Sequence, residues 1–211
     1  MMPIKNDREY RSFASYELRS GEGNDFIVEG YASTFAPYTL ATRNGMEWRE
    51  QIDPHAFDDA DMSDVVFLRD HAGQVFARTK NDTVKLTVDE KGLYTQTDLS
   101  KTSSARTMFE DIQAGNYQQM SFAFIVQDDA FEERSEGDLR IITRTITKIS
   151  KLYDVSAVAF PANPTTDISP ATRAAFDGAI EELEAERLQK KAEANQRARE
   201  RLLLKLKMEE S

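Results

Sequence analysis

The chain has 211 residues, a length that favours one full-sized domain with an appendage over two independent domains. Its 27 Lys and Arg residues face 37 Asp and Glu residues, and the resulting net charge of -10 disfavours nucleic-acid binding, because a phosphate backbone would be repelled. The absence of cysteine excludes disulfides, thiolate zinc sites and cysteine nucleophiles.

The N-terminal residues, 1–25, are interpreted as a lead-in segment. Their first part, MMPIKNDREYRSF, lacks the apolar core of a signal peptide. No stretch of the chain approaches the roughly 20 apolar residues that a membrane span needs. The sequence therefore predicts no membrane association and a location in the cytoplasm of the producing cell.

Residues 26–165 are predicted to form one mainly β domain, because short stretches rich in Val, Ile, Phe, Tyr and Thr are separated by Gly, Asn and Asp. The predicted strands cover residues 26–35, 64–69, 83–88, 92–98, 119–127, 139–147 and 152–160. One short helix is predicted inside this domain, because Ala105, Met108, Phe109 and Ile112 follow the helical spacing and Gly115 stands at the expected stop. A second short helix is predicted over residues 54–60. The fold class is therefore α+β with β dominant.

The segment FPANPTTDISPAT carries three of the six prolines and is interpreted as a domain boundary that continues neither a strand nor a helix. Residues 166–173, which begin inside this segment and end one residue beyond it, are the predicted linker. Residues 174–211 contain mostly Glu, Ala, Arg, Lys and Leu, which predicts one long charged helix.

Three residues of the β domain are candidates for chemistry. His71 follows the apolar strand VVFLRD, and a loop at a strand end is a favourable place for a general base. Ser121 lies in the apolar strand QQMSFAFIV and needs a hydrogen-bond partner there. Asp154 is the carboxylate of the buried-looking strand KLYDVSAVAF, where it needs a cation or donors. For each of the three a purely structural role remains an alternative.

A metal site is an alternative role for the two histidines of the chain. His55 lies in DPHAF, at the start of the short helix predicted over residues 54–60, and together with His71 and either Asp53 or Asp70 it offers nitrogen and oxygen ligands. None of the spacings of a known zinc motif such as H-E-x-x-H occurs. The sequence therefore predicts no metal and no other cofactor.

The order of segments is more specific than any single residue. The chain contains, in this order, GYASTF, EQIDPHAF, DVVFLRDHAGQVFART, EKGLYTQTDLS, DIQAGNYQQMSFAF and KLYDVSAVAFPANP. This succession resembles the prohead maturation proteases of tailed bacteriophages, a family of serine proteases whose fold is similar to that of the herpesvirus assemblins. The resemblance implies a closed or nearly closed β-barrel of the assemblin type, followed here by the long helix.

The resemblance also implies roles for the candidate residues. His71, in LRDH, matches the catalytic histidine of the family, and Ser121, in MSFAF, matches its nucleophile. Asp154, before V-S-x-V, matches an acidic residue that would be the third member. His55 departs from the family pattern, which mostly has glycine there, and this leaves open a Ser-His-His arrangement in which His55 replaces Asp154.

The donors that would stabilise the oxyanion are not fixed by the sequence. Backbone N–H groups of residues 161–164 are candidates for this role, and so are the side chains of Arg140 and Arg144.

Two functions follow as expectations. The first is a serine endopeptidase of phage capsid maturation that cuts scaffold, or the scaffolding part of the capsid protein, and also itself. It would first occupy the host cytoplasm and then the interior of the procapsid, with the capsid or scaffold protein as substrate and docking partner. The second is a non-enzymatic assembly protein whose tail is a docking arm. Whether the chain forms a homo-oligomer stays open.

Overall fold

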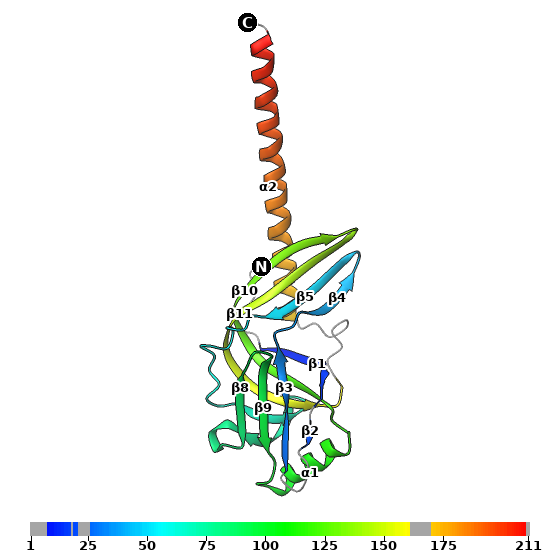
Figure 1. Ribbon diagram of the computed structural model, residues 1–211, viewed down its shortest axis with the longest axis vertical. Helices are drawn as coiled ribbons and strands as arrows, with labels where there is room; N and C mark the ends of the chain where they lie inside the picture. The colour runs from blue at the N-terminus through cyan, green and yellow to red at the C-terminus, as the bar shows by residue number, and fades with distance from the viewer. Residues whose placement is uncertain (1–7, 18, 21–25, 161–169, 210–211) are drawn as a thin grey trace.

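The computed structural model describes residues 8–17, 19–20, 26–160 and 170–209. Two sheets and two α-helices make up this part of the chain (Figure 1). The larger sheet contains β1 (Glu9–Glu17), β4 (Tyr38–Arg43), β5 (Met46–Ile52), β6 (Val66–Arg69), β7 (Ala72–Arg78), β10 (Gln119–Glu136) and β11 (Leu139–Val158). The smaller sheet contains β2 (Arg19–Ser20), β3 (Ile27–Thr34), β8 (Val84–Val88) and β9 (Gly92–Asp98). A 3-10 turn, η1 (Thr79–Asn81), precedes β8.

The long hairpin of β10 and β11 is the centre of the larger sheet. β1 pairs antiparallel with β10 on the outer side of the hairpin. On the other side, β11 pairs in parallel with β5 over Arg140–Ile146 and with β6 over Asp154–Ala157. The end of β6, where His71 follows, is therefore held beside the part of β11 that contains Asp154.

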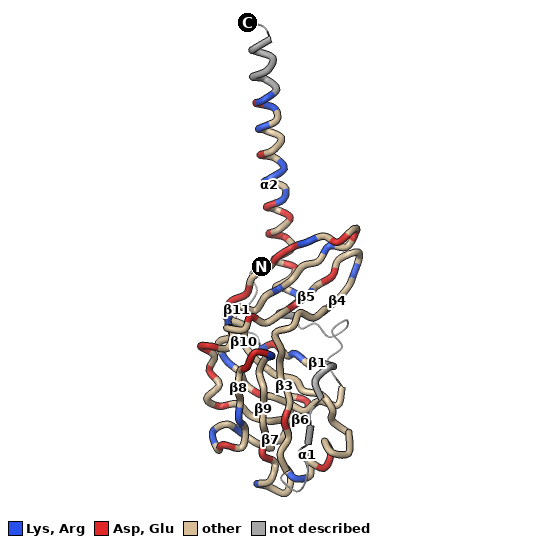
Figure 2. The backbone as a smooth tube through the Cα atoms, viewed as in Figure 1, with Lys and Arg blue, Asp and Glu red and all other residues tan. Residues whose placement is uncertain are grey.

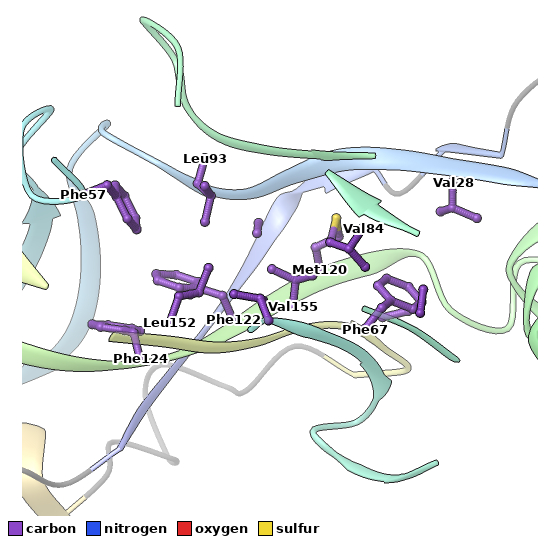
Figure 3. Close-up of a cluster of buried hydrophobic side chains, with 14 of the residues drawn as sticks. Val28, Phe57, Phe67, Val84, Leu93, Met120, Phe122, Phe124, Leu152 and Val155 are labelled. Atoms are coloured by element: carbon purple, nitrogen blue, oxygen red, sulfur yellow. The ribbon is translucent and has the colours of Figure 1, made fainter. Parts of the chain in front are cut away.

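The main core lies between the two sheets and is built from alternate strand residues. Figure 3 shows Val28 and Leu93 of the smaller sheet facing Met120, Phe122 and Val155 of the larger one. All five side chains are buried. This core packs against one face of β10 and β11 and fixes their backbone. The opposite face of these strands can therefore present polar side chains at defined positions.

The two helices have different relations to the core. α1 (Ser103–Gln113) begins at Thr102, whose hydroxyl accepts a hydrogen bond from the Ala105 N–H, and it buries the four predicted apolar residues. α2 (Pro170–Glu209) packs only its first turns on the β-sheet structure, where the Phe176 ring stacks on Trp48 at a centroid distance of 4.8 Å. The rest of α2 projects away from the sheets (Figure 1).

Several predicted elements are confirmed. The strands predicted at 26–35, 64–69, 83–88 and 92–98 correspond to β3, β6, β8 and β9. The strand predicted at 119–127 continues to Glu136 as β10. The two strands predicted at 139–147 and 152–160 form the single strand β11, because polar residues between them pair with β10 across bulges.

Other expectations need correction. Residues 54–60 form turns instead of a helix, held by backbone hydrogen bonds such as that from the Ala56 N–H to the Asp53 carbonyl. The lead-in segment contains β1 and β2. Neither sheet closes on itself within the described residues, so the closed or nearly closed barrel is not confirmed.

The start of the long helix also differs from its sequence-based position. α2 begins at Pro170, where proline fits the first helical turn because that turn needs no backbone N–H bond. The remainder of the predicted linker, residues 166–169, lies outside the described residues. Among the described residues, no helix is both long and apolar enough to span a membrane.

Candidate active site

The position of His71 is set by a tight turn between β6 and β7. Arg69 pairs with Ala72, and the two residues between them, Asp70 and His71, both have positive φ values, of 49° and 56°. Two-residue hairpins favour this conformation because its twist matches that of the strands. The Asp70 N–H donates to the Ala157 carbonyl at 3.0 Å, and the Asp70 carboxylate accepts from the Ala159 N–H at 3.1 Å. These bonds attach the turn to β11.

Ser121 and Asp154 come from neighbouring strands. Ser121 of β10 lies opposite Ser156 of β11, and Ala123 lies opposite Asp154. Because side chains alternate across a strand, Ser121 and Asp154 share the face that lies away from Phe122 and Phe124.

The three candidate residues form a continuous chain of contacts. Nδ1 of His71 lies 2.6 Å from an Asp154 carboxylate oxygen, and Nε2 lies 2.5 Å from the Ser121 hydroxyl. Ser121 and Asp154 are 0% and 1% exposed, whereas the His71 side chain is 16% exposed. A carboxylate on one ring nitrogen and a hydroxyl on the other is the arrangement in which histidine can take the hydroxyl proton.

Comparison with known protein families agrees with the resemblance that the sequence segments indicated. The family model of the caudovirus prohead serine protease matches residues 14–178. The chain belongs to this family. Comparisons with curated proteins and with solved structures found no match. The resemblance seen in the order of sequence segments is thus confirmed, and the family is one of serine proteases.

In this prohead serine protease family member, Ser156 is a site residue that sequence reasoning missed. Its hydroxyl donates to the Asp154 carboxylate at 2.7 Å and lies 3.3 Å from Nδ1 of His71. Ser156 follows Asp154 by two positions in the same strand, so both side chains point to one face. That spacing is the signal in the sequence that could have indicated the contact.

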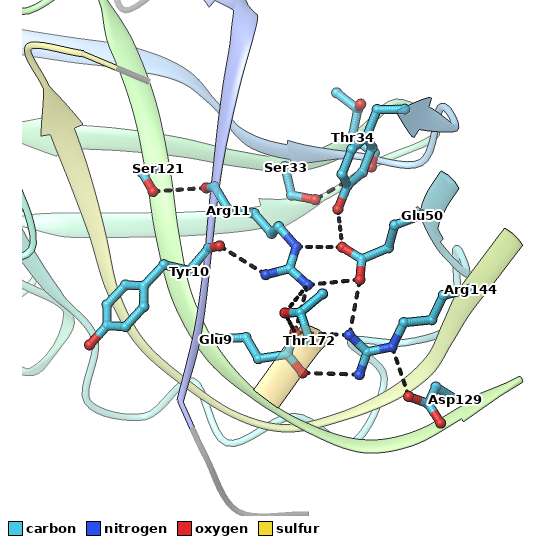
Figure 4. Close-up of polar contacts among 11 residues, drawn as sticks. Glu9, Tyr10, Arg11, Ser33, Thr34, Glu50, Ser121, Asp129, Arg144 and Thr172 are labelled. Atoms are coloured by element: carbon cyan, nitrogen blue, oxygen red, sulfur yellow. Dashed lines mark hydrogen bonds and ion pairs between the residues drawn. The ribbon is translucent and has the colours of Figure 1, made fainter. Parts of the chain in front are cut away.

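Strand β1 also contributes contacts that the sequence did not reveal. The Ser121 hydroxyl donates to the Arg11 carbonyl at 2.8 Å, as Figure 4 shows. The Tyr10 ring meets the His71 ring edge to face, at a centroid distance of 4.7 Å. In this protease family member, β1 thus lies beside Ser121 in the sheet and places the Tyr10 ring against His71.

A buried ionic cluster anchors β1 on the other face of the sheet (Figure 4). We define the ionic cluster as Glu9, Arg11, Glu50, Arg144 and Thr172. The Arg11 guanidinium bonds both oxygens of Glu50, at 2.5 and 2.8 Å, and one oxygen of Glu9, at 2.5 Å. Arg144 bonds Glu9 at 2.8 and 2.9 Å and Glu50 at 3.0 Å. Such fork-shaped pairs fix geometry as well as charge.

Thr172 links the ionic cluster to α2, and the arginines of the cluster keep Glu9 charged. The Thr172 hydroxyl, in the first turns of α2, donates to Glu9 at 2.8 Å. Burial alone would raise the pKa of Glu9, but the charge of Arg11 and the charge and hydrogen bonds of Arg144 lower it from an ordinary value of 4.5 to about 2. Glu9 is therefore ionised at neutral pH, although it is buried.

The remaining candidates lie elsewhere. The His55 side chain is 83% exposed and its Nδ1 lies 3.1 Å from Asp58, so the structure pairs His71 with Asp154 and not with His55. The residues proposed as oxyanion donors are engaged elsewhere or not described. Arg140 bonds Glu133 at 2.8 Å and Glu184 at 3.3 Å. Arg144 belongs to the ionic cluster, and residues 161–164 lie outside the described residues. In the part of the chain that the structure describes, no group of three acidic or histidine residues could hold a metal ion.

Proposed function

We propose that this protein is a serine endopeptidase in which Ser121 is the nucleophile, His71 the general base and Asp154 the residue that orients the base. The observation that carries the proposal is the unbroken chain of contacts from the Asp154 carboxylate through both His71 ring nitrogens to the Ser121 hydroxyl. The family match supports the assignment, because prohead proteases of this family are serine proteases.

The geometry suits a two-stage acyl transfer. As the Ser121 oxygen attacks the substrate carbonyl carbon, its proton moves to Nε2 of His71, and the carboxylate at Nδ1 stabilises the charged ring. His71 then gives that proton to the leaving amine, which departs with its half of the peptide. Water hydrolyses the acyl-enzyme through the same base. Ser156 holds the Asp154 carboxylate through the 2.7 Å bond, so that it faces Nδ1.

The substrate we propose is the scaffold protein or the scaffolding part of the capsid protein, cut inside the procapsid, together with the protease itself. Peptide-bond hydrolysis is irreversible under these conditions, so it gives capsid maturation a direction. The charged α2, which carries both acidic and basic residues along its projecting part (Figure 2), is proposed as the arm that docks the protease on the scaffold or shell.

The test is co-expression of the protein with its capsid protein, followed by mass spectrometry of both chains. We expect cleavage with the native chain and none with Ser121→Ala. Equal processing by the Ser121→Ala variant would contradict the protease assignment. A properly folded native chain that supports assembly without any cleavage would favour the non-enzymatic assembly protein instead.

A further inference from the structure

The nucleophile is covered in this structure. Ser121 is completely buried, and β1 lies along β10 with Ser12 directly opposite Ser121. A polypeptide substrate has to bring its carbonyl carbon to the Ser121 oxygen. With β1 paired on one edge of β10 and β11 on the other, both edges of the nucleophile strand are occupied.

The contact with β1 also concerns the proton that catalysis needs. A serine hydroxyl has one hydrogen to donate. The Arg11 carbonyl accepts from it at 2.8 Å, and Nε2 of His71 lies 2.5 Å from the same oxygen. While β1 is in place, its carbonyl therefore competes with the base for the proton of the nucleophile.

Backbone pairing and side-chain anchoring together make β1 resemble a bound peptide. It adds to β10 as an antiparallel strand, which is a common way for an extended peptide to bind a sheet edge. Its Arg11 side chain is buried against Glu50, which is 0% exposed. Tyr10 covers His71 on the opposite face.

The site that β1 occupies prefers a basic side chain. If β1 leaves, Glu9 and Arg11 leave with it. The departing pair is neutral overall, so what the fully buried Glu50 loses is its two hydrogen bonds from the Arg11 guanidinium. The loss of charge-assisted hydrogen bonds is costly for a buried carboxylate. A replacing peptide whose basic side chain donates to Glu50 removes that cost.

We propose that β1 is an internal ligand of a peptide-binding edge on β10, and that an extended peptide with a basic side chain at the position of Arg11 replaces it to reach Ser121. This inference rests on the proposed function. It adds to that function the place where the substrate binds, the class of side chain that is recognised and an internal competitor for the site.

The first experiment locks β1 in the full-length chain. Tyr10 and Ala123 are directly opposite each other on β1 and β10, and the chain contains no cysteine, so the double variant Tyr10→Cys/Ala123→Cys offers a single disulfide. The readout is the rate at which a fluorophosphonate reagent labels Ser121. We expect labelling at least tenfold slower in the oxidised form than in the reduced form of the same protein.

The controls separate the inference from the function on which it rests. Each single-cysteine variant should label equally fast with and without oxidant, and Ser121→Ala should not label. Equal rates for the oxidised and reduced double variant would overturn the inference and leave the protease assignment standing. If the native chain, the reduced double variant and Arg11→Gln all fail to label, the protease assignment and the inference are both contradicted.

The second experiment tests the basic side chain by complementation. In Arg11→Gln, β1 loses its bonds to Glu50 and we expect faster labelling than in the native chain. A synthetic peptide with the sequence of residues 8–16 should slow that labelling, whereas the same peptide with glutamine in place of the arginine at position 11 should not. Equal protection by both peptides would overturn the proposed preference for a basic residue. Should Arg11→Gln fail to fold, the disulfide experiment still decides whether β1 covers the site.

Discussion

Each side chain of the candidate triad has a distinct task, and substitutions should differ accordingly. We expect His71→Ala to lower kcat/KM as severely as Ser121→Ala, by several orders of magnitude, because the two act as one unit. Asp154→Asn should cost roughly four orders of magnitude, since an amide neither stabilises the charged ring nor holds its tautomer. Cleavage of a peptide substrate, with circular dichroism as the check of folding, measures these effects.

His55 provides the matched control, because it is the other histidine of the chain and its side chain is exposed. His55→Gly should leave kcat/KM within a factor of about two or three, a small effect typical of a surface substitution. An inactive His55→Gly together with an active Asp154→Asn would show that the third member is not Asp154.

Ser156 should act as a positioning residue. Ser156→Ala removes the 2.7 Å hydrogen bond to Asp154, and we expect about a tenfold loss of kcat/KM, which corresponds to roughly 1.4 kcal/mol. Ser150 lies in the same strand, and its hydroxyl is 3.4 Å from the Ile125 carbonyl, away from the triad. Ser150→Ala is therefore the control and should keep full activity. Equal losses in both variants would point to a general effect on β11 instead.

The sequence predicts the candidate triad residues but not their surroundings. His71, Ser121 and Asp154 stand in recognisable segments, so the order of motifs was enough to select them. Arg11 contacts Ser121 across 110 positions of the chain, and Glu50 meets Arg11 from another strand. Contacts between such distant residues depend on sheet topology, which periodicity and composition do not specify.

At the scale of elements, β1 should depend on pH through its anchor. The pKa of Glu9 is about 2 in the folded protein and near 4.5 when the chain is unfolded. A lowered folded pKa means that the charged form stabilises the fold above pH 4.5, and that this contribution is lost as the pH falls from about 4.5 toward 2. We expect β1 amides to exchange faster with solvent over this range, as measured by hydrogen exchange with mass spectrometry.

Glu9→Gln is the control for this prediction, because it keeps the shape of the side chain and removes its titration. The variant should exchange faster than the native chain at pH 7, and its β1 exchange, corrected for the intrinsic rate, should vary less between pH 4.5 and 2. An unchanged pH profile in Glu9→Gln would mean that another group controls the strand.

The elements show where local patterns fail. β8 and β9 alternate clearly and were predicted almost to the residue. β4 and β5 were missed because their sequences, YTLATR and MEWREQI, carry charged residues among the apolar ones. In the folded chain Glu50 of β5 is buried beside two arginines. A charged residue that suggests an exposed loop in the sequence therefore lies in a buried strand.

For the whole molecule, the docked and projecting parts of α2 should be separable. Ala175, Phe176 and Ala179 are buried against the sheets, whereas residues 192–201 are exposed. We expect deletion of residues 192–211 to leave the thermal midpoint and peptide cleavage unchanged. The same deletion should reduce incorporation into procapsids, as quantified by immunoblotting of purified particles.

A longer deletion tests the docked part. Removing residues 174–211 takes away Phe176 and its stacking on Trp48, and loss of a large buried aromatic side chain costs about 3–5 kcal/mol. The thermal midpoint should therefore fall clearly in this variant and not in the shorter deletion. Normal incorporation of the chain that lacks 192–211 would remove the proposed docking role of the projecting helix.

The pairing of β1 with β10 has a consequence for biosynthesis. A ribosome makes the chain from its N-terminus, so β1 leaves the ribosome more than one hundred residues before its partner strand. When β10 emerges from the ribosome with Ser121, β1 is already available, whereas Asp154 and Thr172 have yet to emerge. The strand that covers the candidate nucleophile is thus present before the candidate triad is complete, and the newly made chain need never expose the assembled triad to the proteins of the cell.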